Sequence, residues 1–207
     1  MDGKLRWTLL LLIVGLLVVG CGRIPKIEVV DTPTPTTSPG SGPKPLVAAD
    51  FDSCTGVNNL GGQMGAAYNL PDSLKEKYVE EANRGCVARL EYEIQGWSAF
   101  WMKLQDVDLT PYSKLVFDVR ADPQPGIPKQ IKLELKRANG TEVSITYVSG
   151  IKADWKTMSI SLADLVSTGY ATPLSSFSGM EELVFTFEAA KSGAQGVVYL
   201  DNIVFQP

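Results

Sequence analysis

The chain has 207 residues, of which 44% are hydrophobic and 20% are charged, and its formal net charge is −4. Its 19 glycines and 13 prolines favour a turn-rich, all-β architecture. It contains no histidine, which excludes Ser-His-Asp and Cys-His catalysis and His-ligated zinc, and its mild acidity argues against nucleic acid as a partner.

Residues 1–20 are predicted to be a signal peptide. Lys4 and Arg6 give it a positive start, and residues 9–19 form an apolar run that is short for a bilayer span. The run ends in Gly20-Cys21, which resembles a bacterial lipobox. The resemblance implies cleavage before Cys21 and lipidation of Cys21, for example with palmitate. It places the rest of the chain outside the cytoplasm, on a membrane of a bacterial cell envelope. The alternative is a plain N-terminal membrane anchor with an incidental cysteine.

The two other cysteines, Cys54 and Cys86, remain once Cys21 is assigned to the lipid. Two cysteines left over in an oxidising compartment usually pair. We therefore predict a Cys54–Cys86 disulfide, and the alternative is two buried free thiols.

Residues 21–45, the lipidated cysteine and a Pro/Thr-rich stretch, are predicted to be a disordered linker. Residues 31–45 contain five prolines and no large apolar side chain, so they cannot form a core. Pro-rich chain extends by ~3.1 Å per residue, so this tether would reach roughly 45 Å.

The remaining residues, 46–207, are predicted to form one domain of short strands separated by turn signals. The run from 55 to 67 is glycine-rich and is expected to be a loop or an irregular edge, and residues 163–165 are expected to form one helical turn. The run from 73 to 82 has some helical spacing, but strand is favoured because a turn signal at 83–85 follows it. The predicted strands are 46–51, 73–82, 87–94, 98–104, 115–120, 131–137, 143–147, 155–162, 183–188 and 197–205.

The last of these strands, residues 197–205, is the most β-prone run of the chain and is expected to organise the domain. It contains one acid, Asp201, which needs a partner if it is buried. Period-two alternation and the spacing of turns predict an all-β fold, a two-sheet antiparallel jelly-roll β-sandwich.

Several stretches together resemble carbohydrate-binding modules of the galactose-binding-like jelly-roll superfamily. The resemblance covers nearly all of residues 46–207, and it implies a non-catalytic protein that binds a poly- or oligosaccharide. The stretches are ADFD at 49–52, NNLGGQMG at 58–65, LTPYSKLVFDVRAD at 109–122, IKLELK at 131–136, WKTMSISL at 155–162, MEELVFTFE at 180–188 and VYLDNIVF at 198–205.

The resemblance also implies a structural Ca²⁺ that joins the first and last strands. The matching positions are Asp52 and Asp201, with Asp50 in reserve. Carboxylates gathered at strand ends repel one another unless a hard cation lies between them. The alternative is that Asp201 accepts backbone N–H groups or pairs with Lys or Arg.

Sugar binding requires flat aromatic surface together with polar groups for the hydroxyls. Along residues 97–102, Trp97 and Trp101 share one side and Phe100 the other, and the sequence leaves open which side is the core. Two strands that could be neighbours carry outward charges, which are either a solvated face with weak ion pairs or the polar part of a concave site. These charged residues are Asp118, Arg120, Lys132, Glu134 and Lys136. The candidate ligand-binding residues are Trp97, Trp101, Arg120, Glu134 and Tyr147.

No motif frames a pair of carboxylates, so catalysis is not expected. An envelope assembly or scaffold protein that uses the same sandwich to bind a protein partner remains an alternative. That reading rests on a likeness in fold to the complex I intermediate-associated domain. We expect a monomer anchored to a membrane by its lipid.

Overall fold

The computed structural model describes residues 42–207, so the predicted signal peptide, Cys21 and most of the linker lie outside the described residues. The described part is built from short strands with two very short helices. The strands are β1 (Leu46–Ala49), β2 (Met64–Tyr68), β3 (Ser73–Glu81), β4 (Gly85–Glu93), β5 (Trp97–Val107), β6 (Lys114–Ala121), β7 (Gln130–Arg137), β8 (Glu142–Ser149), β9 (Lys156–Ser161), β10 (Val166–Ser167), β11 (Met180–Glu188) and β12 (Gln195–Gln206). The helices are η1 (Leu162–Asp164) and α1 (Ala189–Ser192).

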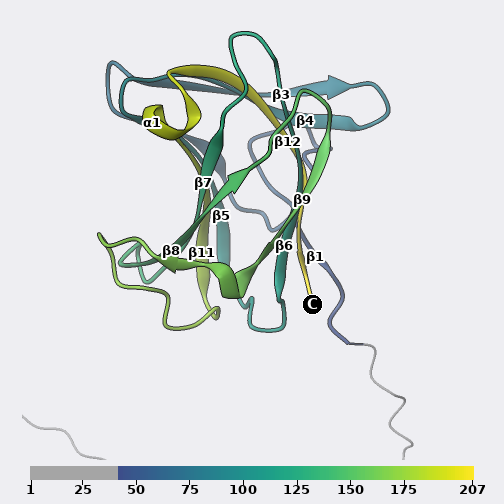
Figure 1. The fold of residues 1–207 in the computed structure, drawn as a ribbon. Coiled ribbons are helices and arrows are strands. Elements are labelled where there is room, and N and C mark those ends of the chain that lie inside the picture. The colour runs from purple at the N-terminus through teal and green to yellow at the C-terminus, as the bar shows by residue number, and fades with distance from the viewer. Residues whose placement is uncertain (1–41) are drawn as a thin grey trace, which may run out of the picture. The chain divides into compact units, whose positions relative to one another are not determined.

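The strands form two antiparallel sheets that pack face to face. We name the sheet with the order β10-β8-β7-β11-β5-β2 the front sheet. We name the other the back sheet; it has the order β3-β4-β12-β6-β9, with β1 also paired to β12. Figure 1 shows the two layers edge-on, with β5, β7, β8 and β11 in one and β1, β6, β9 and β12 in the other. The fold is thus the predicted two-sheet jelly-roll β-sandwich.

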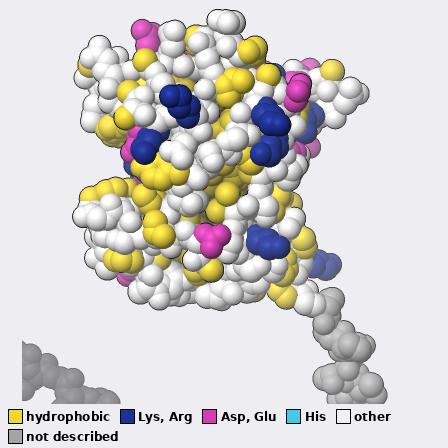
Figure 2. All heavy atoms as spheres, in the orientation of Figure 1, with side chains coloured by type: hydrophobic (Ala, Val, Ile, Leu, Met, Phe, Trp, Pro, Cys, Tyr) yellow, Lys and Arg dark blue, Asp and Glu magenta, His cyan; other side chains and the backbone are white. Residues whose placement is uncertain are grey.

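Strand alternation puts the core between the sheets. In β6, Leu115, Phe117 and Val119 are buried, while Asp118 and Arg120 alternate with them on the outer side. Phe117 meets Phe185 of β11 edge to face across the interior, with ring centroids 5.2 Å apart. In Figure 2, hydrophobic side chains are visible between the two layers and charged groups lie around them on the surface.

The strand β12 is the centre of the back sheet, as its sequence predicted. It pairs with β4 along Gln195–Leu200, with β6 along most of its length, and with β1 near its end. The pairing Leu46↔Phe205 therefore joins the first and last strands of the described domain.

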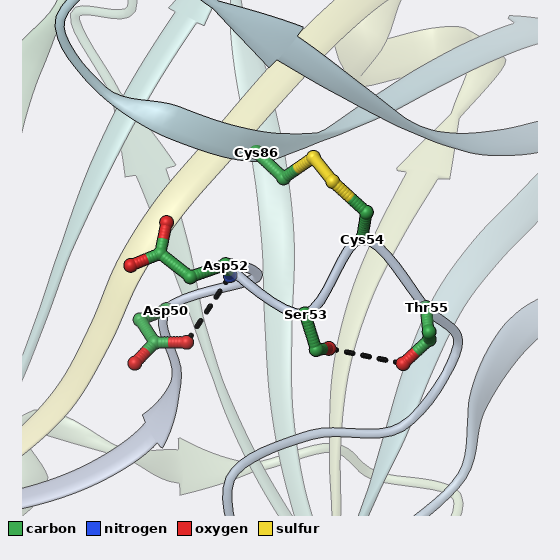
Figure 3. Close-up of a disulfide and its surroundings, with 6 residues drawn as sticks. All are labelled: Asp50, Asp52, Ser53, Cys54, Thr55 and Cys86. Atoms are coloured by element: carbon green, nitrogen blue, oxygen red, sulfur yellow. Dashed lines mark hydrogen bonds between the residues drawn. A yellow bond between two sulfur atoms is a disulfide. The ribbon is translucent and has the colours of Figure 1, made fainter.

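A disulfide links Cys54, in the loop after β1, to Cys86 in β4, with 5.5 Å between their Cα atoms (Figure 3). The predicted pairing is confirmed. The bond closes a loop with a sequence separation of 32, and cross-links of this length restrict the unfolded chain by roughly 3–4 kcal/mol in the loop-entropy description.

In the glycine-rich run at 55–67, a loop leads into β2, which begins at Met64 and pairs with β5 at the edge of the front sheet. The structure corrects one expectation about the strands. The strands β6 and β7 are not neighbours: β6 lies between β12 and β9 in the back sheet, and β7 lies between β8 and β11 in the front sheet. Within residues 42–207 no helix is long and apolar enough to cross a membrane.

Candidate functional site

The outer face of the front sheet carries a groove of about 310 Å³ over β2, β5, β11 and β7. This volume lies at the lower end of the range typical of small-molecule and oligosaccharide-sized sites. Its lining combines aromatic side chains, a row of lysines and glutamates, and the small residues Ala67 and Ala99.

The strand β5 supplies one aromatic wall. Phe100 and Met102 are fully buried in the core, so the opposite side of the strand presents Trp97 and Trp101 to the groove. Trp97 is 38% exposed, and Trp101 lies between Gly65 of β2 and Val184 of β11 in the sheet. The structure thereby decides which of the two aromatic sets faces outward.

Gly65 makes room for the Trp101 indole. A Cβ at this position would stand 2.8 Å from Cζ2 of Trp101, closer than a carbon side chain can approach without displacing the ring. The indole therefore lies against the backbone of β2, and the only sign of this contact along the chain is an isolated glycine.

The floor of the groove is a continuous row of alternating charges. Lys132 pairs with Glu188 at 2.8 Å and with Glu134 at 3.1 Å. Lys136 continues the row, at 3.4 Å from Glu134 and 3.3 Å from Glu182. Lys103 of β5 closes it by pairing with Glu182. Three lysines face three glutamates, so the row carries no net charge.

Glu134 lies at the middle of this row and is only 5% exposed although it points outward. Its carboxylate accepts hydrogen bonds from Oγ1 of Thr186 at 2.9 Å and from the hydroxyl of Tyr170 at 3.2 Å. Burial works to raise the pKa of Glu134, but Lys132, Lys136 and the hydrogen bonds outweigh it and hold the pKa below its usual range. The group is therefore ionised at neutral pH and serves as a hydrogen-bond acceptor.

Tyr170 overhangs the groove from the loop between β10 and β11. Its side chain is 63% exposed, and its ring lies 5.8 Å from Nζ of Lys132. Burial of its hydroxyl, and then the charge of Glu134, raise the pKa of Tyr170 to about 12. The loop is held in place where the backbone N–H of Leu174 donates to Ser144 Oγ at 3.1 Å. Tyr170 could not be assigned from the sequence, because a tyrosine in a loop carries no periodic signal.

Of the other predicted ligand-binding residues, Tyr147 lies near the groove and Arg120 does not. The Tyr147 hydroxyl donates to Glu188 at 3.0 Å, at one end of the charged row. Arg120 lies on the outer face of the back sheet, where it pairs with Glu81 at 2.9 Å and stacks 3.6 Å from the centre of the Tyr199 ring. The prediction that Arg120 shares a face with Glu134 was wrong, because their strands belong to different sheets.

Two of the three carboxylates predicted to bind Ca²⁺, those of Asp201 and Asp50, have protein partners. Asp201 is 2% exposed and accepts hydrogen bonds from Nη1 of Arg84 at 2.8 Å and from the backbone N–H of Asn202 at 2.8 Å. Burial raises the pKa of Asp201, and the hydrogen bond from Arg84 opposes this. Asp50 accepts from the backbone N–H of Asp52 at 3.2 Å (Figure 3).

In the part of the chain that the structure describes, no group of three or more Asp, Glu, Cys or His side chains is arranged to hold a metal ion. Because a guanidinium already neutralises Asp201, the side chains as placed do not fit a calcium ion between Asp52 and Asp201. The calcium site stays a prediction.

Fold and groove together define the structural class of this protein: it is a jelly-roll β-sandwich with an aromatic and charged groove on one outer face. The family described as Carbohydrate binding domain 30 matches residues 55–207, and the chain belongs to that family. No curated protein matches the sequence.

Several solved structures share the fold. The family 11 carbohydrate-binding module of a cellulosomal cellulase of Clostridium thermocellum superposes with a TM-score of 0.63 at 17% identity, over 80% of this chain and 96% of the module. The family 11 module in complex with a β-1,3-1,4-mixed-linked tetrasaccharide gives 0.62 at 18% identity, over 78% and 95%. A family 29 module gives 0.52 at 11% identity, over 79% and 92%.

Proposed function

We propose that the groove of the front sheet binds an uncharged poly- or oligosaccharide chain. The observation that carries the proposal is the pairing of an aromatic wall, Trp97 and Trp101, with a floor of buried and half-buried charged groups. Sugar rings have apolar faces that stack on indoles and hydroxyl edges that hydrogen-bond to carboxylates and ammonium groups. Membership of a carbohydrate-binding family supports the proposal.

The row of charges favours a neutral ligand. The Nζ atom of each lysine in the row lies within 3.4 Å of a glutamate carboxylate oxygen, so each of these three cations already has a countercharge. A uronate carboxylate placed there would lose its water and lie beside Glu134 or Glu188 without gaining a countercharge, which is costly. Hydroxyl groups can instead donate to the glutamates and accept from the lysines without disturbing the pairs.

Affinity electrophoresis of the full chain, purified in detergent, tests this prediction. We expect retardation in gels that contain neutral β-glucans, including a β-1,3-1,4-mixed-linked glucan. The affinity for polygalacturonate or alginate, obtained from retardation at several polymer concentrations, should be at least about tenfold lower, which corresponds to 1.4 kcal/mol. Preferential binding of the acidic polymers would contradict the neutral-ligand proposal. Absence of binding to every glycan, with capture of one defined envelope protein, would favour the scaffold alternative.

We also propose that the module is not itself an enzyme. Hydrolysis of a glycosidic bond by a carboxylate pair needs one carboxyl that stays protonated near neutral pH. In the groove, Glu134 has a lowered pKa, and its neighbour Glu188 is bonded to Lys132 and Tyr147. This arrangement supports a binding role.

We propose, finally, that the chain is held at a bacterial membrane by a lipid on Cys21. Wild type expressed in a bacterium with a labelled palmitate analogue is expected to become labelled, whereas Cys21→Ser is expected to remain unlabelled. The measurement is in-gel detection of the purified chain, and Cys54→Ser serves as the matched control because Cys54 is in the disulfide. Equal labelling of wild type and Cys21→Ser would refute the lipid site.

A further inference from the structure

The turn between β4 and β5, which leads directly into Trp97, is held by a carboxylate from another part of the chain. Asp72 precedes β3 and is 5% exposed. Its Oδ1 accepts from the backbone N–H of Gln95 at 2.7 Å, and its Oδ2 accepts from those of Gly96 at 3.0 Å and Trp97 at 2.8 Å. One side chain thus satisfies three consecutive backbone donors.

These bonds fix the backbone at the point where the groove's outermost indole begins. Hydrogen bonds to an ionised acceptor are shorter and about twice as strong as neutral ones. Hydrogen bonds from the backbone N–H groups, first that of Gln95, lower the pKa of the Asp72 carboxyl, so it is charged at neutral pH. On the other side of the turn, the carbonyl of Gly96 accepts from the N–H of Ala189 in α1 at 2.9 Å.

The turn also leaves little room for a side chain at Gly96. A Cβ at Gly96 would stand 3.1 Å from Oδ2 of Asp72, so glycine allows the carboxylate to reach all three donors. The Trp97 side chain itself is 38% exposed, so packing against other side chains covers only part of it, and its backbone contributes to its position.

We propose that Asp72 is a positioning residue for ligand binding, which acts by fixing the backbone of Trp97 at the rim of the groove. The inference rests on the proposed sugar-binding function. An indole presented in one orientation loses less conformational entropy when a sugar ring stacks on it, so pre-organisation of this kind increases affinity without any contact between Asp72 and the ligand.

A double-mutant cycle separates this role from a general effect on the fold. Isothermal calorimetry with a β-1,3-1,4-mixed-linked tetrasaccharide would compare wild type, Asp72→Asn, Trp97→Ala and the double variant. We expect Asp72→Asn to weaken binding about fivefold in the wild-type background and less than twofold in the Trp97→Ala background. The same fold-loss in both backgrounds, or no loss in either, would overturn the proposal.

Controls keep the result interpretable. Asp108→Asn removes a carboxylate that bonds only within its own turn, to Thr110, at the other end of β5, and should leave affinity unchanged. If Asp72→Asn does not fold, Gly96→Ala disturbs the same contact and takes its place in the cycle.

A measurement without ligand decides the structural half of the proposal. Asp72→Asn is expected to broaden or shift the Trp97 backbone and indole NMR signals and to leave those of Trp101 in place. Unchanged Trp97 signals would refute the role of Asp72 even if sugar binding is weakened. If wild type binds no member of the glycan panel, the proposed function fails, whereas this comparison still shows whether Asp72 holds Trp97.

Discussion

Replacing Trp101 by alanine is expected to weaken sugar binding about 30-fold, which corresponds to ~2 kcal/mol. Trp101 lies at the middle of the groove wall, between Gly65 and Val184 in the sheet, with Nζ of Lys103 5.5 Å from the ring centre. Its loss removes one of the two indoles of the groove wall on which a sugar ring can stack. Calorimetry with the same tetrasaccharide measures the effect.

The matched control is Trp155→Ala. Trp155 packs between Arg84 and Arg120 on the back sheet, 4.1 and 5.5 Å from its ring centre, so its loss should lower stability and leave affinity unaffected. If Trp155→Ala weakened binding as much as Trp101→Ala, the ligand would not lie in the front groove. An unaltered affinity in Trp101→Ala would exclude that indole as a stacking surface.

Arg84→Met is expected to destabilise the domain by about 3 kcal/mol, because it leaves a buried carboxylate without a countercharge. Arg84 Nη1 lies 2.8 Å from Asp201 and 3.0 Å from Asp118, so its removal exposes these two carboxylates to mutual repulsion. Such a loss corresponds to a fall in Tm of roughly 10 °C for a domain of this size. Urea denaturation followed by circular dichroism gives the free energy of unfolding.

The control is Arg89→Met, which removes an arginine from a pair whose partner, Glu91, is 45% exposed. A surface pair of this kind contributes ~0–1 kcal/mol. Equal losses for the two variants would mean that burial of Asp201 does not determine the effect.

Thermal melts of the wild-type chain test the predicted calcium site at Asp50, Asp52 and Asp201. If Ca²⁺ stabilises the wild-type chain, excess EDTA should lower Tm and elemental analysis should find the metal. A melting curve that EDTA leaves unchanged, in a protein without bound metal, would rule the site out and leave Arg84 as the cation that Asp201 requires.

Local alternation in the sequence predicted the strands and their inward faces, because every second side chain of a half-buried strand faces the core and is apolar. In β7, Ile131, Leu133 and Leu135 point inward as expected and Glu134 points outward. The run that contains β2 could be predicted only as a loop or irregular edge, because the strand, MGAAY, is mostly small residues, with Gly65 against the Trp101 indole, and small residues are poor strand signals.

The sequence could not predict which strands are neighbours, since pairing depends on contacts between residues far apart in the chain. Residues 122–129 carry the chain from the back sheet to the front sheet, so Arg120 and Glu134 separate although only fourteen positions divide them. The partner of Asp201 is Arg84, 117 positions earlier. For the same reason, two residues in loops could be assigned only from the structure. They are Tyr170, which lines the groove, and Asp72, which bonds to the turn before β5.

The placement of the disulfide has a mechanical consequence. If the protein is pulled by its N-terminal end while the groove grips an immobile fibre, force enters through β1, a four-residue strand that can peel from β12. Peeling stops at Cys54, because its covalent bond to Cys86 passes the load directly into β4. Extension before the load reaches β4 is thereby limited to residues 46–53, or roughly 25–30 Å at full stretch.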